Sequence, residues 1–490
     1  MSKENHHSRD GFKSRWGFIL ACIGSAVGMA NIWRFPWMLS TYGGLTFLIP
    51  YFIFVVLIGS SGVIEEFALG RRAGAGPVGA FAMCTRERTG KGASGAAIGA
   101  LPIIGAMGLA IGYSVVMSWI FKYAFMSLSG DLYAMGTDMN IIGGTFGQAA
   151  PETETLGEGI RMILENGIFG VGNGLWLIVA VAASFVIMSL GISGGIEKAC
   201  KVMMPILLVL FLVLGVYIAL LPGASDGYKY IFTLKPQGLL DPEVWIYAFG
   251  QAFFSLSVAG NGSVIYGSYL SKAVAIPSSA RNVAVFDTMA SMLAAFVIIP
   301  AMATSGAMLD KGGPGLMFVY LVPVINGMAG GRIVGMIFFV AVLFAGFTSI
   351  INLYEAPTAF LQEQFKLKRL PAVAVTHGVG LVVAILIQAY TSQWMDIVSI
   401  YICPFGALLA GIMFFWILKK ETALSAVNQG SGKTIGGWFH PLGKWVYCPL
   451  CLVALIAETG CILLYIGRRD SKPLCRAQSA GKYDCFGGGL

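Results

Sequence analysis

Long apolar stretches separated by short polar segments recur along the whole chain. A helix that crosses a bilayer needs about 20 predominantly apolar residues, and about eleven stretches reach that length. The pattern predicts spans at 16–37, 44–70, 97–129, 173–190, 196–221, 244–270, 279–308, 332–364, 371–391, 394–418 and 444–467. The chain is therefore expected to be an all-α polytopic membrane protein.

The basic residues between the predicted spans indicate the orientation. Cytoplasmic loops carry an excess of Lys and Arg, and here such residues precede the first span and follow the second, fourth, sixth, eighth and tenth: Lys13, Arg15, Arg71, Arg72, Lys198, Lys201, Lys272, Arg281, Lys366, Lys368, Arg369, Lys419 and Lys420. We therefore expect a cytoplasmic N-terminus, although Arg468, Arg469 and Lys472 after the last span oppose the rule. The predicted outer loops lack N-glycosylation sequons, which favours a prokaryotic plasma membrane.

Two of the predicted spans are interrupted by small and polar residues. The first span contains Gly24–Asn31 and the sixth contains Ser255–Ser263. Unwound backbone within a membrane is tolerated only where it lines a buried or water-filled cavity. The two breaks are five spans apart, and because five is odd the second set of five spans is inverted relative to the first. Interrupted helices at matching positions of two inverted halves are typical of a secondary transporter's central site. The alternative is that these small residues only let helices pack closely.

Composition supports the membrane assignment and excludes several functions. Hydrophobic residues make up 57% of the chain and charged residues 11%, against about 25% charged in soluble domains. The net charge of +8 is scattered, so we expect no nucleic-acid partner. The four histidines form no metal-binding cluster. Gly191–Gly195 matches the Gly-x-Ser-x-Gly pattern of hydrolase nucleophiles, but it lies between predicted membrane helices and not between a strand and a helix, as that motif requires. We expect no enzyme; whether Cys475 and Cys485 pair is left open.

Several motifs resemble the neurotransmitter:sodium symporter family. The most specific is residues 24–36, Gly-Ser-Ala-Val-Gly-Met-Ala-Asn-Ile-Trp-Arg-Phe-Pro, and others are Glu66–Arg71, Gly195–Lys198, Gln251–Ser257 and Ala345–Ser349. The likeness covers about residues 9–467. It implies a LeuT-type fold with two inverted five-helix repeats, broken helices one and six, and sodium-coupled symport of a small amino acid.

The resemblance also implies a division of the chain. We expect a cytoplasmic segment with an inner gate at 1–15, the first repeat at 16–221, an outer loop at 222–243, the second repeat at 244–419, a loop and helix eleven at 420–467, and a polar tail at 468–490. Membrane lipid is an expected partner, and a homo-oligomer is left open.

Two sodium sites follow from the resemblance. One would combine the carbonyls of Gly24, Val27 and Ala345 with the hydroxyls of Thr348 and Ser349. The other would use Ala26, Asn31, Ser255 and Asp287, the last at the start of helix seven, with the substrate carboxylate completing it. Without the resemblance, the two helix-eight hydroxyls would be read as bonding back to carbonyls of their own helix.

The resemblance places the substrate against the break in helix one. Amides near Met29 and Ala30 and the hydroxyl of Tyr113 would hold its carboxylate, and carbonyls around Ala26, Phe254 and Ser255 its amino group. The side-chain pocket would consist of Leu109, Phe254, Ser257, Gly260, Ser349 and Leu353. Gly28 brings no charge and leaves room, and Gly260 is expected to widen the pocket. We therefore expect a neutral L-amino acid, preferably large and apolar or aromatic. Without the resemblance, Tyr113 would be a packing residue.

Gates and buried acids can be assigned in the same way. Arg34 with Asp396 would close the outer side, and Arg9 with Glu363, near Tyr269, the inner side. Such a pair is otherwise a surface ion pair worth under about 1 kcal/mol. Glu66 would support the unwound part of helix six, whereas the roles of Glu355 and Asn261 stay open, and Phe12 replaces a Trp that is frequent in the family.

Chloride is not expected as a second ion. Chloride-dependent relatives hold the anion at positions matching Tyr51, Gln251, Ser255 and Ser291, and the resemblance places Asp287 beside them. Its carboxylate would take the place of the anion. The other readings of the chain are a proton-coupled transporter or a non-transporting solute sensor of the same fold.

Overall fold

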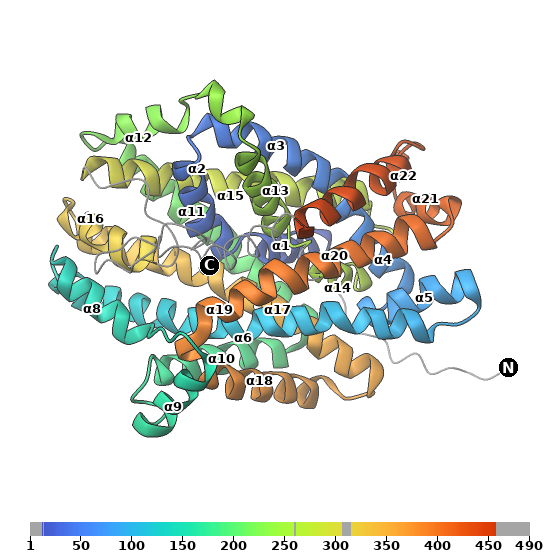
Figure 1. Ribbon diagram of the computed structural model, residues 1–490, viewed down its shortest axis with the longest axis horizontal. Coiled ribbons are helices and arrows are strands. Elements are labelled where there is room, and N and C mark those ends of the chain that lie inside the picture. Colours follow the sequence, from blue (N-terminus) through green and yellow to red (C-terminus); the bar gives the residue numbers. More distant parts are fainter. Residues whose placement is uncertain (1–11, 13, 259–260, 306–314, 457–490) are drawn as a thin grey trace, which may run out of the picture.

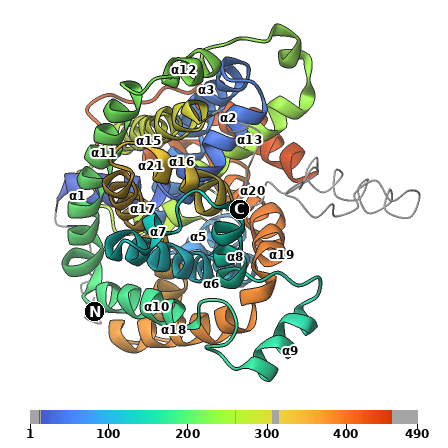
Figure 2. The ribbon, with the colours of Figure 1, turned by 90° about the vertical axis from the view of Figure 1, so that its left-hand side faces the viewer.

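The computed structural model describes residue 12 and residues 14–258, 261–305 and 315–456. All regular secondary structure in this part of the chain is helical, as the apolar pattern predicts. The long helices run roughly along the longest axis of the molecule in Figure 1, and Figure 2 looks along the bundle from one end.

Eight helical segments of the described residues are long and apolar enough to cross a membrane, or nine if a bent pair counts as one span. The bent pair consists of α1 (Arg15–Ala26) on one side of the bend and η1 (Ala30–Arg34) with α2 (Phe35–Thr41) on the other. Four of the eight spans are single helices: α6 (Ala93–Ser129), α15 (Ile276–Thr304), α17 (Gly331–Gln364) and α18 (Arg369–Leu386). The other four are built from consecutive elements: α3 (Leu45–Ser60) with α4 (Gly62–Ala73); η2 (Ile192–Ile196) with α11 (Glu197–Ala219); η5 (Gln388–Tyr390), α19 (Thr391–Asp396), η6 (Ile397–Ile402), α20 (Cys403–Ile412) and η7 (Met413–Ile417); and α22 (Phe439–Leu442) with η8 (Gly443–Tyr447).

Two further predicted spans are present as shorter helices. The fourth is α10 (Gly174–Ser189), and the sixth is divided into α13 (Pro242–Ser255) and α14 (Gly262–Ser268). Each of the eleven predicted stretches therefore contains helix, although residues 457–467 of the last lie outside the described part.

Short helices occupy segments that the hydrophobic pattern left as loops. They are α5 (Pro77–Thr89), α7 (Asp131–Ala134), α8 (Met139–Ala149), α9 (Leu156–Asn166), α12 (Ala224–Ile231), η3 (Pro236–Leu240), η4 (Leu316–Tyr320), α16 (Leu321–Gly327) and α21 (Lys420–Asn428). Figures 1 and 2 place α8, α12 and α16 together at one end of the bundle, and α5 and α21 lie at the opposite end of Figure 1.

Both predicted helix breaks are present. The helical axis bends by 65° between Trp16–Ala26 and Ala30–Thr41, where Val27 adopts an extended conformation. In the sixth span, α13 ends at Ser255, and Ser257 and Asn261 have left-handed backbones with φ of 56° and 55°. Because α1 packs against α11, α15 and α17, its break lies in the interior of the bundle.

Candidate functional site

A cavity lies between the two helix breaks. Its volume is about 50 Å³, room for a few water molecules. Nine of the predicted substrate residues line it: Ala26, Gly28, Ala30, Leu109, Tyr113, Phe254, Ser257, Ser349 and Leu353. The sequence reasoning missed five other lining residues, namely Ser25, Ala106, Gly262, Asn352 and Ala356. Most of these are small residues at helix positions that carry no chemical signal of their own.

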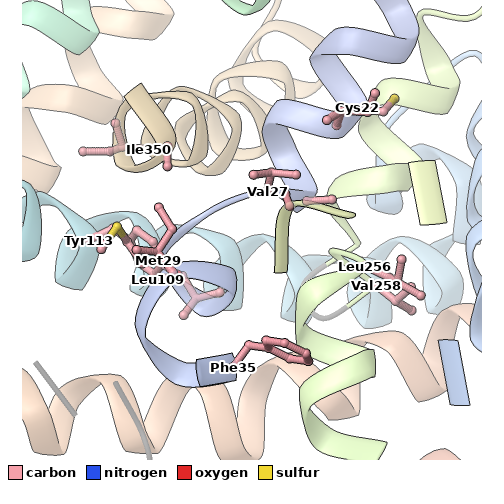
Figure 3. Close-up of a cluster of buried hydrophobic side chains, with 14 of the residues drawn as sticks. Cys22, Val27, Met29, Phe35, Leu109, Tyr113, Leu256, Val258 and Ile350 are labelled. Atoms are coloured by element: carbon pink, nitrogen blue, oxygen red, sulfur yellow. The ribbon is translucent and has the colours of Figure 1, made fainter. Parts of the chain in front are cut away.

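The other predicted substrate residues have different positions. Met29 is buried at the break, on the side of Leu109 and Tyr113 in Figure 3, and its backbone amide is the group that the prediction invokes. Ser255 is fully buried in a polar cluster next to the cavity. Gly260 lies outside the described residues, so the widening expected there stays a prediction.

The backbone at the first break is tied to the sixth span and to α17. The hydroxyl of Ser257 donates to the carbonyl of Ser25 over 2.7 Å, and the amide of Asn352 donates to the hydroxyl of Ser25. A Cβ atom built on Gly28 would lie 2.2 Å from Oγ of Ser349. Gly28 therefore permits a close approach between the backbone at the break and the Ser349 side chain of α17, and the expectation that it leaves room in the pocket is wrong for this conformation.

The residues expected to form the first sodium site meet where α1 crosses α17. A Cβ atom on Gly24 would lie 3.2 Å from Cβ of Thr348. The hydroxyls of Thr348 and Ser349 donate to the carbonyl of Ala345 over 3.0 and 3.1 Å. Both hydroxyl oxygens keep lone pairs beside the broken end of α1, so the back-bonded arrangement also offers oxygen ligands to a cation.

The side chains expected at the second sodium site form one buried cluster. Nδ2 of Asn31 lies 2.7 Å from Oδ1 of Asp287, 3.0 Å from Oγ of Ser255 and 2.8 Å from Oγ of Ser291. Ser255 in turn donates to Oδ2 of Asp287 over 2.7 Å. Oδ1 of Asn31 accepts from the amide of Gly28 over 3.1 Å, so Asn31 would coordinate a cation through the second lone pair of that oxygen or after rotation of its amide group.

One detail of that site corrects the sequence-based expectation. Asp287 lies near the middle of α15, whose N-cap residue is Ala275, and its side chain is fully buried. The expected placement at the start of helix seven is wrong, because the helix begins earlier, at Ile276. Asp287 therefore does not cap a helix, and its carboxylate is held by side chains from α13 and from the first break.

Charged residues lie at both ends of the cavity region. The guanidinium carbon of Arg34 lies 5.5 Å from the centroid of the Phe254 ring, which lines the cavity. The positive charge of Arg34 also interacts with the carboxylate of Asp396. At the other end, both oxygens of Glu363 accept from the amide of Gly76, over 2.9 and 3.1 Å. Arg9, the predicted partner of Glu363, lies outside the described residues.

Tyr269 belongs to a cluster of polar side chains that the sequence did not predict. Its hydroxyl donates to Oε1 of Glu355 over 2.6 Å, and Glu355 forms two bonds with Arg369. The ring of Phe12 lies 6.3 Å from that of Tyr269 and 5.6 Å from that of Tyr266. Glu355 thus has an ion-pair partner on the neighbouring helix, which only the three-dimensional arrangement reveals.

The structure connects Glu66 with the break in the sixth span. Nδ2 of Asn261 donates to Oε1 of Glu66 over 2.9 Å, and both side chains are fully buried. Asn261, whose role the sequence left open, is therefore one of the described residues through which α4 contacts the break in the sixth span.

The fold and this site define a helical membrane transporter with a central cavity between two broken helices. The sodium:neurotransmitter symporter family model matches residues 9–141 and 146–464, so the chain belongs to that family. An uncharacterised sodium-dependent transporter of Methanocaldococcus jannaschii is 30% identical over 466 residues, covering 92% of this chain and 90% of the relative. The predicted family is thereby confirmed, and the chain is a sodium-dependent transporter.

Two further relatives extend the comparison. The crystal structure of MhsT in complex with L-phenylalanine superposes with a TM-score of 0.77 at 29% identity, covering 92% of this chain and 99% of MhsT. The likeness confirms the LeuT-type fold. The sodium-dependent neutral amino acid transporter B(0)AT3 of Mus musculus is 31% identical over 294 residues, which are 58% of this chain and 46% of that protein.

Proposed function

We propose that this protein is a symporter that imports a neutral L-amino acid together with two sodium ions by alternating access. The observation that carries the proposal is the cavity between the two helix breaks, with oxygen-rich clusters from α1, α13, α15 and α17 beside it. Unwound backbone carbonyls and half-helix ends suit ions and charged solutes at this depth.

The first sodium ion would be held by Gly24, Val27, Ala345, Thr348 and Ser349, and the second by Ala26, Asn31, Ser255 and Asp287. All these groups offer oxygen atoms, which hard cations prefer. The substrate carboxylate would approach the second ion from the cavity, because Ala26, one of the expected ligands of that ion, also lines the cavity. Sodium and substrate would then stabilise each other's binding, which is the basis of coupling.

The lining of the cavity supports a neutral substrate with its own carboxylate. The described lining residues include no charged side chain, and Gly28 supplies none at the first break. The hydroxyl of Tyr113 and the amides at Met29 and Ala30 would hold the carboxylate, whereas Leu109, Phe254 and Leu353 offer an apolar surface. MhsT binds L-phenylalanine in its crystal structure, which supports an apolar or aromatic side chain here as well.

A cavity of about 50 Å³ is smaller than a large side chain requires. The half-buried Leu353 and the Phe254 ring would therefore move apart when an aromatic substrate enters. Arg34 with Asp396 would close the outer path, and Glu363 with Arg9 and Tyr269 the inner path. The protein would lie in a prokaryotic plasma membrane with its N-terminus in the cytoplasm, and transport would not require chloride.

The decisive experiment is transport by purified protein in proteoliposomes. Inside-negative vesicles with sodium outside should accumulate the labelled amino acid above its external concentration, and an imposed proton gradient without sodium should not replace sodium. The substrate is identified beforehand by the thermal stabilisation that each of the common amino acids gives with and without sodium. Accumulation driven by protons alone would favour a proton-coupled transporter, and sodium-dependent binding without any flux would favour a sensor.

A further inference from the structure

A pair of adjacent carboxyl groups lies buried outside the cavity lining. Glu65 and Glu66 follow each other on α4, and each is 0% exposed. Oε1 of Glu66 accepts from Asn261, whereas its Oε2 and both carboxyl oxygens of Glu65 lack a hydrogen-bond partner within the described residues. A buried carboxylate without partners costs several kcal/mol, so this arrangement needs an explanation.

A tyrosine from the last span lies beside these two acids, and this is an independent observation. Tyr447 of η8 is fully buried, and its hydroxyl has no nitrogen or oxygen partner among the described residues, only the weakly bonding thiol of Cys451 beside it. A Cβ atom on Gly62 would lie 2.7 Å from that hydroxyl oxygen. Gly62 precedes Glu65 and Glu66 by three and four positions, so it shares their face of α4. Tyr447 interacts electrostatically with both acids.

No cation of the described part of the chain compensates Glu65. Arg71 on the same helix donates to the carbonyls of Val274, Ala426 and Gln429. Arg72 forms a salt bridge with Glu87. A lysine or arginine partner, the usual way to keep a buried carboxylate ionised, is therefore missing from this cluster as far as the structure describes it.

The other titratable groups that face Glu65 are all acidic. Glu66 faces it from α4, Cys84 from α5, and Tyr447, Cys448 and Cys451 from the last span. The remaining elements packed on α4, which are α3, α14, α15, α20 and α21, contribute no titratable side chain to this group among the described residues. Each neighbour that ionised would add negative charge, so the surroundings favour an uncharged Glu65.

We propose that Glu65 is a proton-binding site: together with Glu66 it holds one proton, which resides on Glu65. The hydrogen bond from Asn261 stabilises the charged form of Glu66, whereas Glu65 receives no donor and keeps its carboxylic acid proton. The site differs from both sodium sites in its residues and in its place on α4. It extends the proposed function and does not depend on which solute is carried.

The proton site is connected to the cavity by a short path. Asn261 contacts Glu66 and is followed by Gly262, which lines the cavity. Loss of the proton would put a second negative charge beside Glu66 and change its hydrogen bond with Asn261. Because linkage between two binding sites is reciprocal, proton loss at Glu65 would then weaken ligand binding at the cavity.

The proton on Glu65 can be observed by infrared difference spectroscopy of the full-length protein. Wild type should show a carboxylic acid C=O band that shifts in D₂O, and Glu65→Gln should remove this band. Glu87→Gln is the matched control, because Glu87 is exposed and paired with Arg72; it should leave the band unchanged. A band that persists in Glu65→Gln would overturn the proposal.

The link to the cavity is tested by sodium-dependent binding of the labelled amino acid between neutral and alkaline pH. Wild-type affinity should fall at alkaline pH, and Glu65→Gln should move this loss by at least about one pH unit, since an amide cannot ionise. Glu65→Met serves as a second uncharged variant in case Gln fails to fold. If both variants lose substrate affinity at the same alkaline pH as wild type, or if both fail to fold, the proposal that Glu65 is uncharged and linked to the cavity is refuted.

Discussion

Arg369 holds both carboxylate oxygens of Glu355: its Nη1 lies 2.7 Å from Oε1 and its Nη2 lies 2.6 Å from Oε2. Glu355 on α17 is fully buried, and Arg369 is the first residue of α18. Nε of Arg369 also donates to the carbonyl of Met188 at the end of α10, and Tyr269 after α14 donates to Glu355. One ion pair thus connects four helices near the predicted inner gate.

We predict that Arg369→Met lowers the free energy of unfolding by about 3–5 kcal/mol, because removal of one partner leaves a buried charge uncompensated. Denaturant titration in detergent measures the change. Arg72→Met is the matched control, since Arg72 and Glu87 are partly exposed and such pairs contribute under about 1 kcal/mol. In the double variant Arg369→Met with Glu355→Gln, much of the stability should return. Equal effects of the two single arginine variants would contradict the buried-pair interpretation.

The membrane spans were predictable from the sequence because their cause is local. A run of apolar side chains specifies a spanning helix whatever it packs against, and Gly24–Asn31 and Ser255–Ser263 interrupt such runs visibly. The short helices between the spans were harder to see. α9 carries a recognisable signal, the Thr155–Glu158 capping box, whereas α12 begins after a glycine without any side-chain cap.

The candidate site was only partly predictable because its contacts join distant segments. Asn31 and Asp287 are separated by 256 positions, and Asn261 and Glu66 by 195. The family motifs indicated most of these residues individually, but no local pattern indicates that Asn261 bonds Glu66. The wrong placement of Asp287 at a helix start has a local origin: the polar start of α15, at Ile276–Asn282, lacks an N-capping side chain and resembles a loop.

The hydroxyls of Thr348 and Ser349 should determine sodium dependence. We predict that Thr348→Ala with Ser349→Ala abolishes sodium-dependent uptake and leaves the protein folded, because the lost bonds to Ala345 only duplicate bonds of the helix itself. The measurement is initial uptake over a range of sodium concentrations. Thr358→Ala removes a hydroxyl of α17 that bonds to the carbonyl of Tyr354 and to the hydroxyl of Thr376 on α18, and it should keep the wild-type curve because Thr358 is not an expected sodium ligand. A double variant with unchanged sodium dependence would show that the site is misassigned.

The contact of Gly28 with Ser349 predicts a steric block at the first break. Gly28→Ala would put a methyl group 2.2 Å from Oγ of Ser349, a distance that requires the Ser349 side chain or the backbone at the break to shift. We predict a loss of substrate binding by at least about tenfold, measured as sodium-dependent binding of the labelled amino acid. Gly378→Ala on α18, where a Cβ atom would meet nothing within 4 Å, is the control and should bind normally. Normal binding by Gly28→Ala would mean that this contact is absent from the binding conformation.

The buried carboxylate of Asp287 decides the expected response to chloride. It lies among Asn31, Ser255 and Ser291, at the positions where chloride-dependent relatives are expected to hold an anion. The hydroxyl of Tyr51 faces the same cluster. At about 5 Å and an effective dielectric constant near 20, a carboxylate attracts a sodium ion by roughly 3 kcal/mol and repels a chloride ion by a similar amount.

We therefore predict that transport is independent of chloride and that Asp287 is ionised when sodium is bound. Replacing chloride by gluconate should leave wild-type uptake unchanged, whereas Asp287→Asn should fail to transport or should require chloride, because the neutral amide no longer offsets the charge of sodium. Asp226→Asn, which changes an exposed acid paired with Lys229, is the control and should behave like wild type. If wild-type uptake stops in gluconate, the cluster around Ser255 and Ser291 binds chloride despite Asp287, and the carboxylate cannot be ionised beside it.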